Sequence, residues 1–330
     1  MFLIFFVLIV IAIILWLVKE LLYPSQRKNI EGKHVVITGG SSGIGKAAAI
    51  LAAKKGAHVT IIARDVQKLE AARNEILNVC RNRDTQRIEY LPLDITEDYE
   101  AIEKSLLDIE KTMGPIYMLV NCAGTAICGK IEDTTIDNLK WMINLNLMGT
   151  YYCTKAVIPR MKSAKDGIIV ITSSQAALLG IFGYSAYCSS KFALRGLAES
   201  LAMEVNPHNV SVTLCLPPDT DTPGFAIEEL SKPLETKLIS ESAGLVSPEV
   251  VAKQLIADAC AGKFFSTVGF EGFILTTLSA GMSPVSSIAE LFVQFLTMGL
   301  LRIVGAFYLF SFQRIIKNCI NVRDKNKKSE

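Results

Sequence analysis

A tyrosine and a lysine stand four positions apart at Tyr187 and Lys191, and the next residues, Phe192-Ala193-Leu194, favour a helix. In a helix, residues at this spacing project from one face. A free tyrosine has a pKa near ~10, too high for a proton relay at neutral pH, but a neighbouring ammonium favours the phenolate and should lower the pKa of Tyr187. The pair could then donate a proton to the alkoxide that forms when hydride attacks a ketone.

Two serines, Ser173 and Ser174, follow an apolar stretch at 167–172 that predicts a strand. A hydroxyl at a strand end can hydrogen-bond a substrate carbonyl and share the negative charge that develops on its oxygen. We assign this catalytic role to Ser174, and Ser173 is the adjacent candidate, as a substrate contact, if the register differs by one residue. A tyrosine and a lysine at this spacing often pair on exposed helices without any catalytic role. The catalytic interpretation therefore depends on their position after a strand that ends in serine.

A glycine-rich turn follows the first predicted strand and precedes a predicted helix. The residues expected to contact a cofactor there are Gly39, Ser41, Ser42, Gly43, Ile44 and Gly45. Backbone amides in such a turn can approach a pyrophosphate, which then lies at the positive end of the helix. An ordinary strand–helix turn needs neither so many glycines nor two serines beside them, so the turn predicts a dinucleotide site.

The end of the second predicted strand distinguishes NADPH from NADH. Sites selective for NAD place an acidic residue there to bind the ribose 2′-hydroxyl. In this chain the strand ends at Arg64, with Asp65 next and Lys68 one turn later. An arginine fork and a lysine suit a 2′-phosphate, so NADPH is the expected cofactor, while Asp65 keeps NADH as the alternative.

The middle of the chain, residues 32–270, alternates short apolar stretches with amphipathic helices. The predicted strands are 34–38, 58–64, 87–94, 117–121, 167–172, 211–216 and 264–268. This alternation indicates an α/β fold with a Rossmann-type, doubly wound parallel sheet that is covered on both faces. Ligands bind at the carboxyl edge of such a sheet, so Asp94 and Asn121, at the ends of the third and fourth strands, are further expected cofactor contacts.

Composition argues against several other classes of protein. The net charge is +2 among 330 residues, and the basic residues lack the clustering with aromatics that a nucleic-acid groove needs. Three histidines show no ligand spacing to the eight cysteines, so no metal is expected. The cysteines are scattered without CxxC spacing, which favours free thiols in a reducing compartment over a disulfide framework.

The N-terminal residues 1–23 predict a membrane anchor. Residues 1–18 carry no charge, and a run of about 18 apolar residues is long enough to cross a bilayer. A cleaved signal peptide is the alternative, but neither a basic start nor a cleavage site is evident. Basic residues such as Lys19, Arg27 and Lys28 lie on the C-terminal side of the uncharged run, which places the rest of the chain in the cytosol. A polar linker, 24–31, joins the anchor to the domain.

The C-terminal region is apolar over residues 271–313 and basic over residues 314–330. Arg302 interrupts the apolar part, and because a charge at mid-bilayer is costly, a shallow hairpin or an interfacial helix is favoured over a simple span. A hydrophobic lid packed on the soluble domain is the alternative. The last four residues, Lys327-Lys328-Ser329-Glu330, resemble the dilysine signal that returns membrane proteins to the endoplasmic reticulum.

Taken together, the glycine turn from Thr38, the Asn-Cys-Ala-Gly stretch, an Asn-Leu-Met-Gly stretch, the serine pair and the Tyr-Cys-Ser-Ser-Lys segment resemble the short-chain dehydrogenase/reductase family. The resemblance implies that Tyr187 is the acid/base and that Lys191 binds the nicotinamide ribose and tunes the tyrosine. It also implies that Asn146 holds a water in the proton relay and that Thr222 contacts the nicotinamide.

Two departures from the family pattern stand out. The family usually has paired asparagines where this chain has Asn121-Cys122, and Pro-Gly where it has Pro217-Pro218. A second proline stiffens the loop under the nicotinamide, because proline fixes φ.

The stretches 216–225 and 232–236, with the two apolar ends, are similar to one branch of that family. The resemblance implies reduction of 3-ketosphinganine, a long-chain lipid ketone, to sphinganine with NADPH on the cytosolic face of the endoplasmic reticulum. That ketone carries an ammonium group, and Asp219 or Asp221 could pair with it. Both carboxylates could equally cap turns in their Pro-rich loop.

Two other functions remain open at this stage. A membrane-bound steroid or retinoid reductase needs the same catalytic residues and differs only in its pocket. A non-catalytic, NADP-binding scaffold at the membrane needs none of them, and the complete set of Tyr187, Lys191, Ser174 and Asn146 argues against it. The oligomeric state is open, a homo-oligomer included.

Overall fold

The structure is a computed structural model that describes residues 27–241 and 244–329. The predicted membrane anchor, 1–23, and residues 24–26 of the linker lie outside the described residues, as do the side chains of Lys327, Lys328 and Ser329 and the whole of Glu330.

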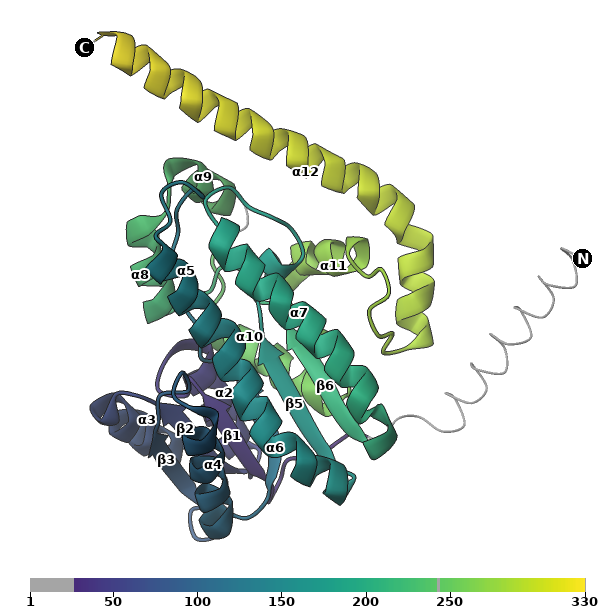
Figure 1. Ribbon diagram of the computed structural model, residues 1–330. Coiled ribbons are helices and arrows are strands. Elements are labelled where there is room, and N and C mark those ends of the chain that lie inside the picture. The colour runs from purple at the N-terminus through teal and green to yellow at the C-terminus, as the bar shows by residue number, and fades with distance from the viewer. Residues whose placement is uncertain (1–26, 242–243, 330) are drawn as a thin grey trace, which may run out of the picture.

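The domain is built on a seven-stranded sheet whose order is β3-β2-β1-β4-β5-β6-β7, with every pair of neighbouring strands parallel (Figure 1). The strands are β1 (His34–Thr38), β2 (His58–Ala63), β3 (Ile88–Pro92), β4 (Ile116–Asn121), β5 (Gly167–Thr172), β6 (Val210–Cys215) and β7 (Phe265–Ser266). This sheet confirms the predicted Rossmann-type architecture, and the strand order changes direction between β1 and β4, where such folds bind ligands.

Helices cover both faces of the sheet and complete three layers. They are α2 (Gly43–Lys54), α3 (Val66–Asn78), α4 (Tyr99–Met113), α5 (Ile136–Met142), α6 (Thr150–Ala164), α7 (Ser185–Val205), α8 (Pro223–Ser231), α9 (Leu234–Glu241), α10 (Pro248–Cys260), α11 (Gly269–Leu278) and α12 (Ile288–Ser329). Apolar residues of α2, α3 and α10 pack on one face of the sheet, and those of α4, α6 and α7 pack on the other.

Strand β1 shows why its sequence is apolar throughout. Val35 and Ile37 belong to the core under α2 and α10, whereas Val36 belongs to the core under α4 and α6. All three side chains are 0% exposed. Because neighbouring residues of a strand point to opposite faces, a strand buried on both faces needs apolar residues at every position, and burial of each such side chain contributes about 1.5–3 kcal/mol.

The register of the central strands places the site residues at one edge. Thr38, the last residue of β1, pairs with Ile62 of β2 and with Asn121, the last residue of β4. The glycine-rich turn after β1 and the Asn-Cys-Ala-Gly stretch after β4 therefore begin at the same level. The Thr38 hydroxyl holds them together, because it accepts hydrogen bonds from the backbone N–H groups of Cys122 at 3.1 Å and Ala123 at 3.2 Å.

The apolar C-terminal region forms two helices of different character. Helix α11 is short and buries Ile274 and Thr277 against the domain. Helix α12 extends over the region of α9 and α11 and away from the sheet (Figure 1), and it continues from the apolar segment into the basic tail without a break at residue 313. Among the described residues, this helix is apolar and long enough to span a membrane over Ile288–Asn326, with mean hydropathy 1.7 and 6% of its most apolar window buried.

Candidate active site

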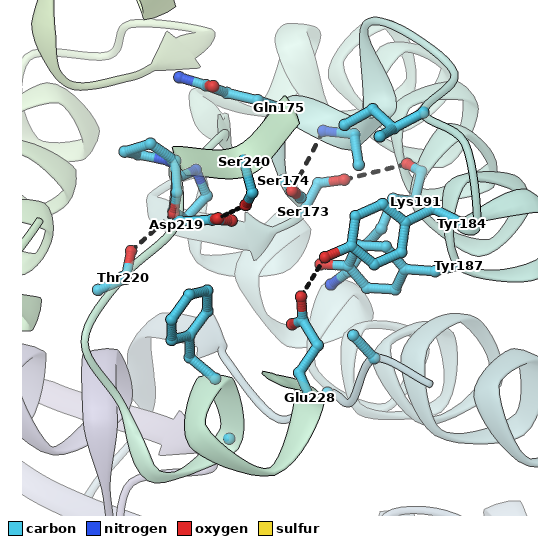
Figure 2. A pocket seen from close by; sticks show the side chains of 18 of the residues that line it. Ser173, Ser174, Gln175, Tyr184, Tyr187, Lys191, Asp219, Thr220, Glu228 and Ser240 are labelled. Carbon is cyan, nitrogen blue, oxygen red and sulfur yellow. Dashed lines mark hydrogen bonds between the residues drawn. The ribbon is translucent and has the colours of Figure 1, made fainter. Parts of the chain in front are cut away.

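A cavity of about 240 Å³ lies at the carboxyl edge of the sheet, beyond the ends of β4, β5 and β6 (Figure 2). Its walls include Tyr187, Lys191 and Ser174, together with Ile44 from the first turn of α2. The structure thus brings three of the four predicted catalytic side chains together beside the glycine-rich turn, although they come from separate parts of the chain; the fourth, Asn146, is not among the residues that line the cavity.

Tyr187 and Lys191 project from one face of α7 toward the sheet edge. The Lys191 Nζ atom lies 5.6 Å from the centre of the Tyr187 ring and donates a hydrogen bond to the backbone carbonyl of Thr172 at 3.2 Å. Only 5% of Lys191 is exposed, and burial lowers the pKa of its ammonium to about 8. The hydrogen bond to Thr172 fixes the ammonium under the tyrosine.

The pKa of Tyr187 differs from the sequence-based expectation. Burial, and then the charge of Glu228, raise this pKa above the ordinary tyrosine value, while a hydrogen bond with the Ser174 side chain lowers it in part. The ammonium of Lys191 lies beside the ring as expected, but desolvation of the phenolate decides the direction of the shift. Tyr187 is therefore protonated at neutral pH and ready to donate.

The two adjacent serines face different partners. The Ser173 hydroxyl is 4% exposed and donates to the backbone carbonyl of Lys191 at 3.0 Å, so it ties β5 to α7. The Ser174 hydroxyl accepts from the backbone N–H of Ala176 at 3.1 Å, and its side chain lies near enough to Tyr187 to lower the pKa of the phenol in part. Ser174 is thus the serine placed beside Tyr187, and Ser173 has a structural partner.

Asn146 lies in a π-helical segment (Ile143–Gly149) between α5 and α6, a distortion that is frequent at functional sites. Its amide oxygen accepts from the backbone N–H of Thr125 at 2.8 Å, and its nitrogen donates to the Thr125 carbonyl at 3.0 Å and to the Ser190 hydroxyl at 2.9 Å. Asn146 therefore joins the cavity-lining loop after β4 to the helix that carries Tyr187.

The glycine-rich turn forms a cradle that side chains would fill. A Cβ atom on Gly45 would lie 2.3 Å from the carbonyl oxygen of Gly39. Gly43 has φ +52°, and a Cβ atom there would lie 2.9 Å from the Thr222 side chain. The Ser42 side chain makes no capping hydrogen bond to α2. This close-packed backbone at a helix N-terminus fits the pyrophosphate of a dinucleotide, and Thr222 lies across from it.

The residues expected near the adenosine ribose also lie close together. One guanidinium nitrogen of Arg64 is 3.8 Å from an Asp94 carboxylate oxygen, and 61% of the Arg64 side chain is exposed. The Lys68 side chain is 70% exposed and lies 3.5 Å from Asp65. Asp65 caps α3 by accepting from the backbone N–H of Lys68 at 3.1 Å, which lowers its pKa. The carboxylate is thus engaged with its own helix.

Asn121 and Cys122, which stand where the family usually has paired asparagines, have different surroundings in the structure. Asn121 is 1% exposed and its nitrogen donates to Thr154 at 3.2 Å and to the carbonyl of Val170 at 3.3 Å, so its side chain joins the sheet to α6. Cys122 lines the cavity, and its sulfur lies 3.0 Å from the Thr172 hydroxyl. The side chain expected to contact the cofactor is directed into the protein instead.

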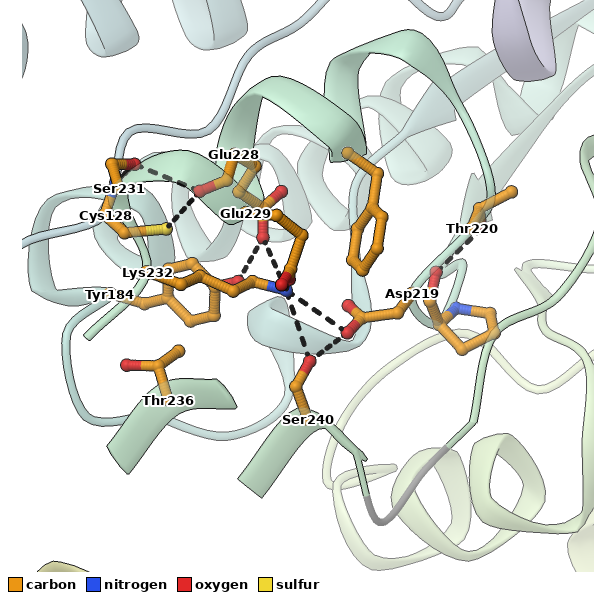
Figure 3. Close-up of polar contacts among 12 residues, drawn as sticks. Cys128, Tyr184, Asp219, Thr220, Glu228, Glu229, Ser231, Lys232, Thr236 and Ser240 are labelled. Carbon is orange, nitrogen blue, oxygen red and sulfur yellow. Dashed lines mark hydrogen bonds and ion pairs between the residues drawn. The ribbon is translucent and has the colours of Figure 1, made fainter. Parts of the chain in front are cut away.

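The structure also contains an acidic cluster around Lys232, of which the sequence analysis singled out only Asp219 (Figure 3). Glu228 of α8 accepts a hydrogen bond from the Tyr184 hydroxyl, and Asp219 accepts one from Ser240. Lys232, whose side chain is 0% exposed, pairs with both carboxylates. The i,i+4 spacing of Glu228 and Lys232 on a helix was the available signal.

Of the two aspartates considered for the substrate, the structure places one at the cavity. Asp219 lines it. Asp221 is exposed and is not among the lining residues, and its backbone N–H donates to the carbonyl of Val246 at 2.9 Å.

A family model for the short chain dehydrogenases matches residues 33–230. The chain therefore belongs to the short-chain dehydrogenase family, and the fold and family indicate an NAD(P) cofactor. A 3-dehydrosphinganine reductase of Danio rerio is 47% identical over 319 residues, which cover 97% of this chain and 96% of that protein. A 3-ketodihydrosphingosine reductase of Bos taurus is 46% identical over 318 residues, or 96% of this chain and 95% of that protein.

Solved structures share the fold. Levodione reductase superimposes with a TM-score of 0.66 at 20% identity, covering 74% of this chain and 99% of its own. A short-chain dehydrogenase from Streptomyces avermitilis has a TM-score of 0.63 at 28% identity, covering 74% and 91%. Both alignments leave about a quarter of this chain uncovered.

Proposed function

We propose that this protein reduces 3-ketosphinganine to sphinganine with NADPH, in the synthesis of sphingolipids. The observation that carries the proposal is the convergence of Tyr187, Lys191 and Ser174 in one cavity beside the glycine-rich turn. The substrate follows from the relatives, which align over nearly the whole chain and are named for this ketone.

The residues of the cavity account for the proton part of the reaction. When bound, NADPH supplies the hydride that attacks the carbonyl carbon. Ser174 hydrogen-bonds the carbonyl oxygen and, as negative charge develops there, Tyr187 donates its phenolic proton to that oxygen. One hydride on carbon and one proton on oxygen together give the alcohol.

Lys191 and Asn146 support this proton transfer without contacting the carbonyl group. The buried ammonium of Lys191 stabilises the tyrosinate left after proton donation, and burial alone does not discharge Lys191, because its pKa stays at about 8. Asn146 fixes the loop at Thr125 on one side and Ser190 of α7 on the other, so it holds the cavity-lining loop against the helix that carries Tyr187.

The preference for NADPH rests on Arg64 and Lys68. Both side chains are exposed beside the end of β2 and can reach a 2′-phosphate. Asp65, the residue that would favour NADH, already caps α3.

We further propose that the protein acts at the endoplasmic reticulum membrane with its catalytic domain in the cytosol. Three features support this location: the apolar helix α12, the apolar N-terminal segment and the Lys327-Lys328 pair near the C-terminus. A substrate with a long alkyl chain stays in a bilayer, so its enzyme benefits from being tethered beside it.

Consumption of NADPH by the purified protein tests the proposal against its rivals. The substrates are 3-ketosphinganine, a ketosteroid and retinal, each assayed with NADPH and with NADH. We expect turnover of 3-ketosphinganine with NADPH, and a preference for the steroid or for retinal would contradict the proposed substrate. A Tyr187→Phe protein that fully rescues cells lacking the enzyme would point to a non-catalytic scaffold.

A further inference from the structure

The side of the cavity formed by α8 and α9 holds three carboxylates around one buried ammonium, and Glu228 is the least exposed of the three, at 13% of its side chain against 29% for Asp219 and 36% for Glu229 (Figure 3). The Nζ atom of Lys232 lies 2.5 Å from Glu229, 3.2 Å from Glu228 and 3.5 Å from Asp219. One ammonium cannot neutralise three carboxylates. Uncompensated charge away from water is costly, so this corner favours a further cation, and both Glu228 and Asp219 line the cavity where one could enter.

Glu228 is the carboxylate that lies beside the reacting groups. Its Oε1 atom accepts a hydrogen bond from Tyr184, and the rings of Tyr184 and Tyr187 are 5.3 Å apart between centres. Figure 2 shows the Glu228 carboxylate directed at the hydroxyl end of this tyrosine pair. Asp219 is held on the far side of Lys232 by Ser240. The Glu228 side chain is 13% exposed, so water screens its charge little.

The proposed substrate has a cation in the matching place. In a long-chain 2-amino ketone, the ammonium is attached to the carbon next to the carbonyl. When the carbonyl oxygen is within about 2.7–3.0 Å of the Tyr187 hydroxyl, the ammonium can reach the carboxylate beside that tyrosine. We propose that Glu228 binds the substrate ammonium and thereby selects 2-amino ketones over ketones that lack the amine. This inference rests on the proposed function.

The cluster prepares Glu228 for this role. Tyr184 fixes one carboxylate oxygen, and Lys232 partly offsets the rise in the pKa of Glu228 that burial causes. A bound substrate ammonium would add a second positive charge to this cluster, and only that one small group would lose its water on binding. A ketone without the amine would leave the carboxylate without that partner, which disfavours its binding.

The test compares two ketones that differ only in the amine: 3-ketosphinganine and 1-hydroxyoctadecan-3-one. For the full-length protein with NADPH, kcat/KM is measured for both, and their ratio is the selectivity for the amine. We expect Glu228→Gln to lower this ratio by roughly tenfold or more, mainly through a higher KM for the amino ketone. Any change in the pKa of Tyr187 acts on both ketones and cancels in the ratio, while glutamine keeps the shape of the side chain and an acceptor for Tyr184.

Glu229→Gln is the matched control. It removes a carboxylate from the same lysine on the same helix, but Glu229 does not line the cavity, so the ratio should stay at the wild-type value. Calorimetric binding of sphinganine and of the corresponding diol without the amine provides the same comparison without turnover. Thermal unfolding of each variant checks that it is folded.

Three outcomes would overturn the inference. An unchanged ratio in Glu228→Gln, with the wild type active on the amino ketone, contradicts it while leaving the proposed function intact. A lowered ratio in Asp219→Asn with none in Glu228→Gln assigns the ammonium to Asp219. A wild-type protein that reduces neither ketone contradicts the proposed function itself, and the inference with it.

Discussion

The cofactor end of the cavity is shaped by backbone, whereas the substrate end is shaped by charged side chains. At the cofactor end, Gly45 packs on the carbonyl of Gly39 with no room for a Cβ atom. At the substrate end, Glu228 and Asp219 take their positions from Lys232, which is buried among them. A backbone cradle can serve any dinucleotide, but a cluster of side chains can be exchanged to suit one substrate. The comparison suggests that specificity resides in α8 and α9.

Loss of the Tyr187 hydroxyl, which lies between the two ends of the cavity, should have the largest effect on activity. Tyr187→Phe should lower kcat by about 10²–10⁴-fold, because general acid catalysis contributes on that scale. The affinity for NADPH, measured by fluorescence titration, should stay near wild type. Tyr151→Phe, on the exposed face of α6, is the control, and equal kcat in both variants would contradict the assigned role.

The substrate end should depend on Lys232 for its stability. Lys232→Met leaves three carboxylates without their shared counterion, and breaking a buried ion pair costs about 3–5 kcal/mol. Urea unfolding of the wild type and of Lys232→Met measures this loss of stability. Lys111→Met removes an ion pair of 2.8 Å whose lysine is 74% exposed, and it should leave the unfolding midpoint unchanged. Equal midpoints for all three proteins would show that the cluster does not stabilise the fold.

The cofactor end should instead depend on the absence of side chains. Gly45→Ala forces a methyl group against the Gly39 carbonyl, so we expect about 1–3 kcal/mol of destabilisation and weaker binding of NADPH. The control is Gly196→Ala in α7, where no atom lies within 4 Å of the added Cβ, and the helix should gain about 0.4–1 kcal/mol. A Gly45→Ala protein that binds NADPH normally would contradict the cradle.

Arg64 should have the smallest effect, because it acts on one phosphate at the rim. Arg64→Ala should lower kcat/KM for NADPH by about tenfold and leave the value for NADH unchanged. Arg83→Ala, in the loop after α3, changes another exposed arginine away from the site and should alter neither value. A parallel loss with both cofactors would show that Arg64 does not distinguish them.

The sequence predicted the sheet well because its strands are buried on both faces and therefore apolar at every position. Strands β1 and β5 begin and end as expected, and the others differ by one or a few residues at their ends. Tyr187, Lys191 and Ser174 were found because their spacing and order along the chain are fixed by local chemistry.

The remaining site residues depend on contacts that local patterns do not reveal. Asn121 stands at the expected strand end, but its side chain bonds to Thr154 and β5. The raised pKa of Tyr187 reflects burial, which a sequence does not state. Glu228 and Tyr184 lie 44 positions apart and meet only in the folded chain, so no local sequence pattern links the two.

Two of the side chains by which helix α12 contacts the domain, Phe312 and Arg323, lie on one face of the helix, because about three helical turns separate them. Phe312 is part of the cavity wall, and Arg323 pairs with the buried carboxylate of Glu235 on α9. The remaining surface of the helix carries exposed Phe295, Leu300 and Phe310. Through these contacts, a continuous helix connects its exposed apolar surface to the wall of the cavity. A displacement of α12 would therefore change the shape of the cavity that Phe312 lines.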